Sequence, residues 1–155
     1  MNGTFPILLA LTLLLPGLIH AASGDAPFKC QPTPADQLGP FYVPDAPVRA
    51  KVGQGYVLRG AVRSAADCVA INGAKIEVWL VGPAGSYDDD HRATLFSDKS
   101  GGYRFESNFP PAYVGRPPHI HIRVSATDFR PLVTQHYPET GKSGASFDLV
   151  LVPIR

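Results

Sequence analysis

The stretch Arg116-Pro117-Pro118-His119-Ile120-His121-Ile122-Arg123-Val124 joins a rigid proline pair to an alternating segment. Its second half is rich in branched apolar residues, which favours a β-strand, and residues i and i+2 of a strand share one face. His119 and His121 therefore point the same way, about 6.6 Å apart along the strand, a gap that two imidazoles can close onto one metal ion. The alternative is a pair of polar residues on the solvated face of an edge strand, but the spacing and the prolines favour a ligand pair.

Alternating segments recur on both sides of this strand at near-regular spacing. We predict strands at residues 56–63, 74–81, 91–96, 103–107, 119–124, 132–137 and 146–152. No segment has a helical period, and the 16 prolines and 15 glycines of the chain disfavour long helices. The pattern predicts an all-β fold, and short strands with frequent turns are typical of a β-sandwich.

Two segments precede the predicted sandwich. Residues 6–19 are almost wholly apolar and lead into small residues at 21–23, which is typical of a secretory signal peptide, although residues 1–4 carry no Lys or Arg. The apolar run is broken by Pro16 and is shorter than the roughly 20 residues of a membrane span. We therefore predict a cleaved signal peptide at residues 1–22 and a secreted or periplasmic protein. Closely spaced prolines in residues 23–52 forbid regular helix and predict an extended arm over a sandwich domain of residues 53–155.

The length, hydrophobic content and net charge of the chain limit the kinds of function that we expect. The chain has 155 residues, 45% of them hydrophobic, which is enough for one domain with a real core. A formal net charge of +1 gives no electrostatic reason to expect nucleic acid or an anionic membrane surface as a partner. A homo-oligomer is compatible with the sequence, which leaves the oligomeric state open.

Cys30 and Cys68 both follow the predicted signal peptide, and they lack the C-x-x-C spacing of zinc or thioredoxin-type sites. A disulfide in an oxidising compartment is the favoured use, and it would tie the N-terminal arm to the sandwich. The alternative is two unrelated buried thiols.

The histidine pair needs further ligands if it binds a metal. Zinc and copper sites usually complete such a pair with another histidine, a cysteine or a carboxylate, so His136 could complete a copper or zinc carrier site. The side chains closest to the pair in sequence are phenols. Tyr113 precedes His119 by six residues, and Tyr87 lies in the predicted loop after strand 74–81.

Several short motifs occur in a fixed order along the chain. They are Ile76-Glu77-Val78-Trp79, Gly85-Ser86-Tyr87, Asp98-Lys99-Ser100-Gly101-Gly102-Tyr103-Arg104-Phe105, Tyr113-Val114-Gly115-Arg116-Pro117-Pro118-His119-Ile120-His121 and Thr134-Gln135. Together they resemble the catalytic domain of the intradiol ring-cleavage dioxygenases, a family that includes catechol and protocatechuate dioxygenases. The segments Thr33-Pro34 and Gly39-Pro40-Phe41-Tyr42 resemble the stretch that these proteins carry ahead of the sandwich. The most specific element is Gly-Arg-x-x-His-x-His with upstream tyrosines.

This resemblance implies a non-haem Fe(III) dioxygenase that uses O2 to open catechol-type aromatics to muconate-type diacids. The ligands it implies are two tyrosines and two histidines, namely Tyr87, Tyr113, His119 and His121. Phenolates are hard anions that suit a ferric ion. The link between Tyr113 and His119 is shorter than in better-known members, so Tyr137 remains an alternative second tyrosine ligand.

The resemblance also implies roles for two residues beside the metal. Arg116 matches an arginine that lies over the bound substrate and steadies negative charge, and Gln135 matches a glutamine beside it. A rival interpretation is an exported binding module of transthyretin or carboxypeptidase-accessory type without a metal. That interpretation explains Trp79 and the strand pattern equally well, but it gives no reason for the tyrosines, Arg116 and the histidine pair to coexist.

Overall fold

The structure, a computed structural model, describes residues 28–154, so the predicted signal peptide and the first residues of the predicted arm lie outside the described residues. Eight strands form two facing sheets. The strands are β1 (Tyr56–Ser64), β2 (Lys75–Leu80), β3 (Arg92–Phe96), β4 (Gly102–Ser107), β5 (Ile120–Ser125), β6 (Leu132–His136), β7 (Gly144–Ser146) and β8 (Leu149–Leu151). The predicted all-β sandwich is confirmed.

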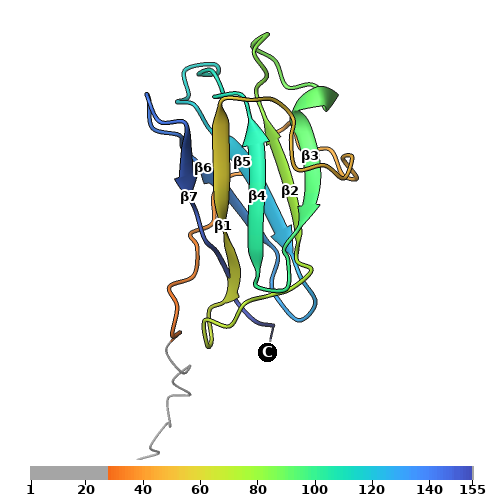
Figure 1. Ribbon diagram of the computed structural model, residues 1–155, viewed down its shortest axis with the longest axis vertical. Helices are drawn as coiled ribbons and strands as arrows, with labels where there is room; N and C mark the ends of the chain where they lie inside the picture. Colours follow the sequence, from red (N-terminus) through yellow and green to blue (C-terminus); the bar gives the residue numbers. More distant parts are fainter. Residues whose placement is uncertain (1–27, 155) are drawn as a thin grey trace, which may run out of the picture.

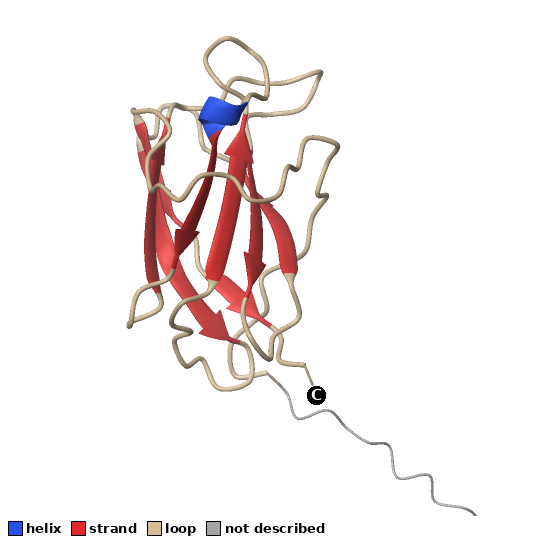
Figure 2. Cartoon of the chain, turned by 90° about the vertical axis from the view of Figure 1, so that its right-hand side faces the viewer, coloured by secondary structure: helices blue, strands red, loops and turns tan. Residues whose placement is uncertain are grey.

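One sheet has the order β4-β1-β7, with β8 also paired to β1, and the other has the order β3-β2-β5-β6. In Figure 1 the first sheet lies in front of the second, and Figure 2 shows the two layers from the side with loops at both ends. A single 3-10 turn, η1 (Asp89–His91), precedes β3 and is the one helical element among residues 28–154. None of the described residues forms a helix long and apolar enough to span a bilayer.

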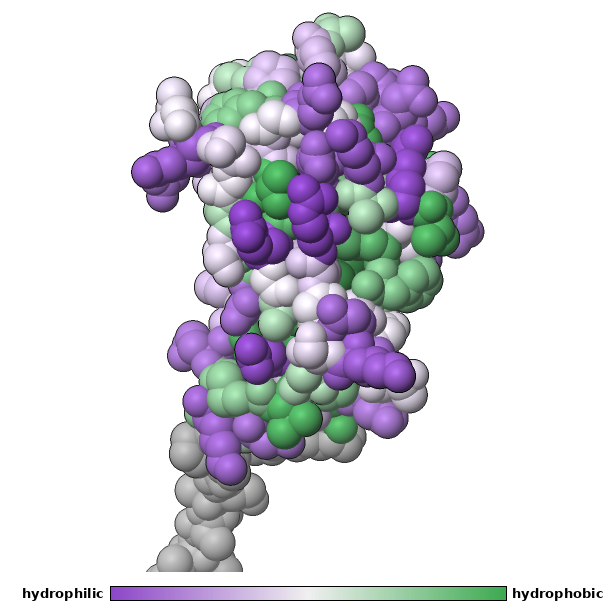
Figure 3. Space-filling model, viewed as in Figure 1, coloured by the Kyte–Doolittle hydropathy of each residue, from purple (hydrophilic) through white to green (hydrophobic). Residues whose placement is uncertain are grey.

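Alternation along the strands builds the core between the sheets. On β5 the residues Ile120, Ile122 and Val124 have no exposed surface and face inward, whereas His121 and Arg123 point to the outer face. Tyr56, Leu58 and Phe105 contribute the opposite wall from β1 and β4. On the face drawn in Figure 3, hydrophilic residues are interspersed with patches of hydrophobic ones.

Six of the predicted strands are present within two residues of the expected bounds, but the expected strand at residues 146–152 is wrong as a single element. It divides into β7 and β8, which both pair with β1 in parallel. Between them the Phe147 carbonyl packs against Gly60, where a Cβ would lie 2.1 Å from that oxygen. The Asp148 carboxylate accepts from the Ala61 amide at 2.8 Å, in place of a backbone carbonyl. Because the Asp148 side chain replaces a backbone carbonyl as acceptor, the strand is interrupted but the Ala61 amide of β1 keeps a hydrogen-bond partner.

Residues 36–48 cross the outer face of the β3-β2-β5-β6 sheet, from β6 to β3. The Asp36 amide donates to the Val133 carbonyl at 2.9 Å, and the Thr94 amide donates to the Pro47 carbonyl at 2.9 Å. Tyr42 packs on Trp79, with ring centroids 5.2 Å apart, and so anchors the segment on β2. A disulfide joins Cys30 to Cys68, which confirms the predicted pairing. The outer face of β5 is therefore covered rather than solvated.

Candidate metal and substrate site

His119 lies immediately before β5 and His121 lies within it, both on the outer face of the sheet beneath the N-terminal segment. Each is only 2% exposed, and β5 runs between β2 and β6. The alternative of two polar residues on a solvated edge strand is therefore wrong. Two buried imidazoles on one face need partners, because an unpaired buried polar group is costly.

Each imidazole is held from a different side. Nδ1 of His119 lies 2.7 Å from the Pro117 carbonyl, and since a carbonyl only accepts, this nitrogen carries the proton and Nε2 keeps its lone pair. The His121 ring stacks on Trp79 at a centroid distance of 5.0 Å and an angle of 5°. Gly39 packs against its other side, where a Cβ would lie 3.1 Å from Cε1 of His121.

Tyr87 brings its hydroxyl to both histidines. Its oxygen lies 2.9 Å from Nε2 of His119 and 3.2 Å from Nε2 of His121. The ring of Tyr87 stacks on Phe41, with centroids 4.4 Å apart and an interplanar angle of 14°. Two imidazole nitrogens and one phenol oxygen thus converge on one point.

The loop after β2 holds Tyr87 in this position. This loop and the loop before β5 emerge at the same end of the sandwich, the upper end in Figure 1. The Gly82 amide donates to the Ser86 carbonyl at 2.9 Å. The Asp88 carboxylate contacts both the amide of His91, at 3.0 Å, and its ring nitrogen, at 2.6 Å. The backbone on both sides of Tyr87 is therefore tied down.

Burial keeps Tyr87 and His121 in their neutral forms. It raises the pKa of Tyr87 to about 12, against a smaller lowering by nearby Arg116. Burial, with the adjacent His119, lowers the pKa of His121 to about 4. A phenol has only one proton to donate to two acceptor nitrogens, and Nδ1 of His121 has no hydrogen-bond partner among the described residues. This donor set fits a hard cation, because a cation uses all three lone pairs and makes deprotonation of the phenol favourable.

A cavity of about 400 Å³ opens over this point. It is lined by Gln37, Gly39, Pro40, Phe41, Tyr87, Tyr113, Val114, Arg116, His119 and His121. The ring of Tyr113 meets that of Tyr87 edge to face, at a centroid distance of 5.2 Å. The cavity therefore holds a second phenol oxygen, which is the fourth possible donor, and one guanidinium beside the three converging donors.

Arg116 is held by Gln135, a residue of β6, and by Tyr137, which follows the last residue of β6. Its guanidinium donates to Oε1 of Gln135 at 2.8 Å and to the hydroxyl of Tyr137 at 3.1 Å. Nε2 of Gln135 donates in turn to the Gln37 carbonyl at 2.7 Å, and the Tyr137 hydroxyl donates to Asp36 at 2.8 Å. Gln135 thus orients Arg116 rather than contacting the converging donors.

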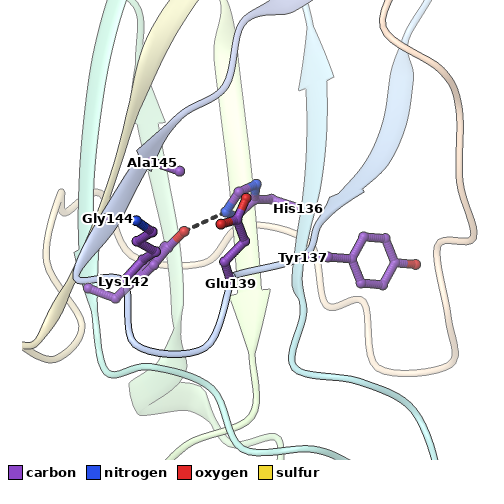
Figure 4. A pocket seen from close by; sticks show the side chains of 7 residues that line it. His136, Tyr137, Glu139, Lys142, Gly144 and Ala145 are labelled. Carbon is purple, nitrogen blue, oxygen red and sulfur yellow. Dashed lines mark hydrogen bonds between the residues drawn. The ribbon is translucent and has the colours of Figure 1, made fainter.

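Tyr113 and Tyr137, the two candidates for the second tyrosine ligand, occupy different positions relative to the cavity. Tyr113 lines the cavity with Tyr87. Tyr137 is 42% exposed, and its ring points away from His136 and Glu139 (Figure 4). Its hydroxyl is engaged by Asp36 and Arg116. The geometry favours Tyr113 over Tyr137 as a donor into the cavity.

His136 lies outside the cavity that holds His119 and His121. Its register partner on β5 is Ile120, so it faces the interior, and its Nε2 lies 2.6 Å from the Tyr56 hydroxyl (Figure 4). No three His, Cys, Asp or Glu side chains within the described chain are grouped as a metal site. A copper or zinc carrier built on His119, His121 and His136 is therefore wrong.

The sequence did not predict how much of the cavity wall comes from the N-terminal segment. Gln37, Gly39 and Phe41 all line it, and Asp36 supports it through Tyr137. The motif Gly39-Pro40-Phe41-Tyr42 was the available signal, but its role depends on contacts with residues far along the chain.

Comparisons with known proteins identify the chain's relatives. No family model matches it. The catechol 1,2-dioxygenase of Candida albicans is 32% identical over 64% of this chain and 45% of its own length. The chlorocatechol 1,2-dioxygenase of Pseudomonas putida is 32% identical over 67% of this chain and 53% of its own length. The chain is a homologue of the intradiol ring-cleavage dioxygenases. It spans about half the length of these two relatives.

Solved intradiol dioxygenases share its architecture. The dioxygenase domain of a dioxygenase and carbohydrate-binding protein fusion from Streptomyces sp. SirexAA-E matches with a TM-score of 0.70 and 25% identity, over 80% of this chain and 100% of that domain. The chlorocatechol 1,2-dioxygenase of Pseudomonas putida matches with a TM-score of 0.66 and 25% identity, over 77% of this chain and 71% of its own. The intradiol sandwich is thus retained in this shorter chain.

Proposed function

We propose that this protein is an Fe(III)-dependent intradiol dioxygenase that opens a catechol-type aromatic between its two hydroxylated carbons, giving a muconate-type diacid. The observation that carries the proposal is the convergence of the Tyr87 oxygen with Nε2 of both His119 and His121, in a chain homologous to catechol dioxygenases. Tyr113 would complete the ligand set from the same cavity. When bound, a ferric ion supplies the Lewis acidity that lets a catechol chelate as a dianion and react with O2.

The chain's own residues have separable tasks. Tyr87 must give up its proton, and because burial holds its pKa near 12, this happens only beside a strong cation. His119 offers Nε2 in the correct tautomer because the Pro117 carbonyl holds the proton on Nδ1. His121 stays neutral at physiological pH because its pKa is about 4. The site therefore presents lone pairs rather than competing protons.

Substrate deprotonation requires a base and a nearby positive charge. We assign one base to the Tyr113 oxygen, which would take one hydroxyl proton of the catechol, and the second proton would go to a hydroxide ion from solvent. Arg116 would steady the negative charge of the resulting dianion. Gln135 and Tyr137 hold the guanidinium by two hydrogen bonds, which leaves its remaining donors for the cavity. Phe41 and the tyrosines form an aromatic wall that suits a planar ring.

We further propose that the protein acts outside the cytoplasm, in the periplasm or the medium. Support comes from the Cys30–Cys68 disulfide, since such bonds persist in oxidising compartments, and from the signal-like sequence of residues 1–22. The N-terminal residue of protein recovered from the periplasm or medium, determined by mass spectrometry, tests this. Protein found only in the cytoplasm with an intact Met1 would contradict it.

The decisive experiment combines colour, oxygen and product. Protein purified with iron should bind one ferric ion and show a broad visible band from tyrosinate-to-iron charge transfer. Catechol added without oxygen should shift that band, and admitting oxygen should consume one O2 per catechol and yield a muconate, followed by its ultraviolet absorbance. A folded, iron-supplied protein that stays colourless and consumes no O2 overturns the proposal.

A further inference from the structure

The cavity has a buried polar end and an exposed apolar edge. His119 and His121 at the polar end are each 2% exposed, whereas Val114, which also lines the cavity, is 84% exposed. Val114 lies at the tip of the turn between Tyr113 and Arg116. A ring whose hydroxyl groups face the polar end therefore directs its opposite edge toward the side on which Val114 stands.

The backbone at Val114 is strained. Its φ is 45°, in the left-handed region that β-branched residues rarely adopt. The amides of Tyr113 and Arg116 each donate to the other's carbonyl, at 3.1 and 2.9 Å, and Gly115 also has a positive φ of 76°. This is a two-residue hairpin turn with positive φ at both central positions, for which Asn-Gly is strongly preferred to Val-Gly.

The valine gains nothing from the core that would offset this strain. With 84% of its surface exposed, its apolar side chain is hydrated in the free protein. Asparagine or glycine would relieve the strain and remove the exposed apolar surface together. Strained residues of this kind concentrate at ligand-contacting sites, where a bound molecule covers them.

We propose that Val114 is a specificity-determining residue that contacts an apolar substituent on the substrate ring, on the edge opposite the two hydroxyl groups. The substrates it favours are catechols with an alkyl group at position 4, over those with a further hydroxyl there. The inference rests on the proposed function, since it takes the hydroxyl-bearing edge of the ring to lie at the histidines.

The test compares Val114→Asn and Val114→Gly with the natural protein. The ratio of kcat/KM for 4-tert-butylcatechol to that for 1,2,4-trihydroxybenzene should fall about tenfold in both variants, the low end of what one lost apolar contact costs in a pocket. The Tm of both variants should rise as the strain is relieved. Val69→Asn is the matched control, because Val69 is another exposed valine, outside the cavity, and it should leave the ratio unchanged.

The two hypotheses can fail separately. Anaerobic calorimetry of the same two ligands gives the ratio of affinities without any turnover. A natural protein that binds both ligands but opens neither ring would contradict the proposed function, and the affinity ratio would still decide the role of Val114. An unchanged ratio in both variants overturns that role, and so does a lower Tm, which would give the valine a structural reason to be there.

Discussion

The hydroxyl of Tyr87 lies 2.9 Å from Nε2 of His119, although the two residues are 32 positions apart in the sequence. One comes from the loop after β2 and the other from the start of β5, and these strands pair in register from Lys75 with Ser125 to Leu80 with Ile120. The pairing brings the two loops to the same end of the sheet. The site is thus a consequence of sheet register, and single substitutions should separate its parts.

Tyr87→Phe should remove iron binding while keeping the fold. The variant retains the ring stack on Phe41 but loses the oxygen that meets both histidines. Iron affinity should fall more than about 100-fold, since losing groups that only orient ligands already costs 10–100-fold. Iron content and the visible band measure this. Tyr42→Phe is the control, because Tyr42 packs against Trp79 outside the cavity, and this variant should keep its iron.

Tyr113→Phe and Tyr137→Phe should differ in colour. Tyr113 lines the cavity, whereas the Tyr137 hydroxyl is bound by Asp36 and Arg116. Loss of a coordinating phenolate should weaken and move the visible band in the Tyr113 variant, with a large fall in kcat. The Tyr137 variant should keep the band and show a smaller loss in kcat/KM. The reverse pattern would make Tyr137 the second tyrosine ligand.

Local periodicity was enough to predict β5 and the shared direction of its histidines, because alternation is encoded in neighbouring residues. It could not show that Gly39 packs on His121, since that contact depends on how the N-terminal segment crosses the sheet. The break between β7 and β8 was hidden for a similar reason. The Asp148 side chain replaces a strand carbonyl, and nothing in the alternating pattern of residues 146–152 reveals that exchange.

Arg116→Ala should keep iron and colour but lose turnover. The guanidinium is held by Gln135 and Tyr137, and the converging donors do not depend on it for their hydrogen bonds. Removing a charge that stabilises a developing anion typically costs about 10²–10³ in rate. Arg104→Ala, on the other sheet, is the control and should behave as the natural protein. An iron-free but folded Arg116→Ala protein would contradict the assigned role.

The iron-free protein should lose stability in mild acid, partly through His136. Burial lowers the pKa of His136 below the ordinary value of about 6.5 that it has in the unfolded chain. As the pH falls through about 6.5 the unfolded state takes up a proton that the folded state refuses, so the free energy of unfolding decreases. This stability is fully present above that pH and is lost below it.

His136→Gln isolates the contribution, because a glutamine can still accept from the Tyr56 hydroxyl. Urea denaturation gives the free energy of unfolding at pH 7 and pH 5. Between these two values it should fall less in the variant than in the natural protein, by up to about 1.4 kcal/mol per pH unit. His121, whose pKa is also lowered by burial, should keep part of the slope. If the free energy of unfolding depends equally on pH in the two proteins, His136 takes up its proton in the folded state as readily as in the unfolded state.

Gly39→Ala tests whether the N-terminal segment closes the site. Gly39 has a φ of 71°, and a Cβ there would lie 3.1 Å from Cε1 of His121, so an alanine must push the segment or the imidazole away. Gly73→Ala is a matched control, because Gly73 has the same φ of 71° and a Cβ there would meet nothing within 4 Å. Both variants should lose about 1 kcal/mol or more of stability to backbone strain.

Only the Gly39 variant should also change the site, because only its added methyl group meets a proposed ligand. Its iron affinity should fall about 10–100-fold, as when a group that orients a ligand is removed, and its visible band should shift relative to the Gly73 variant. Comparing the two variants cancels the cost of the backbone conformation and leaves the contact with His121. Equal iron affinity in both would mean that the N-terminal segment covers the histidine without positioning it.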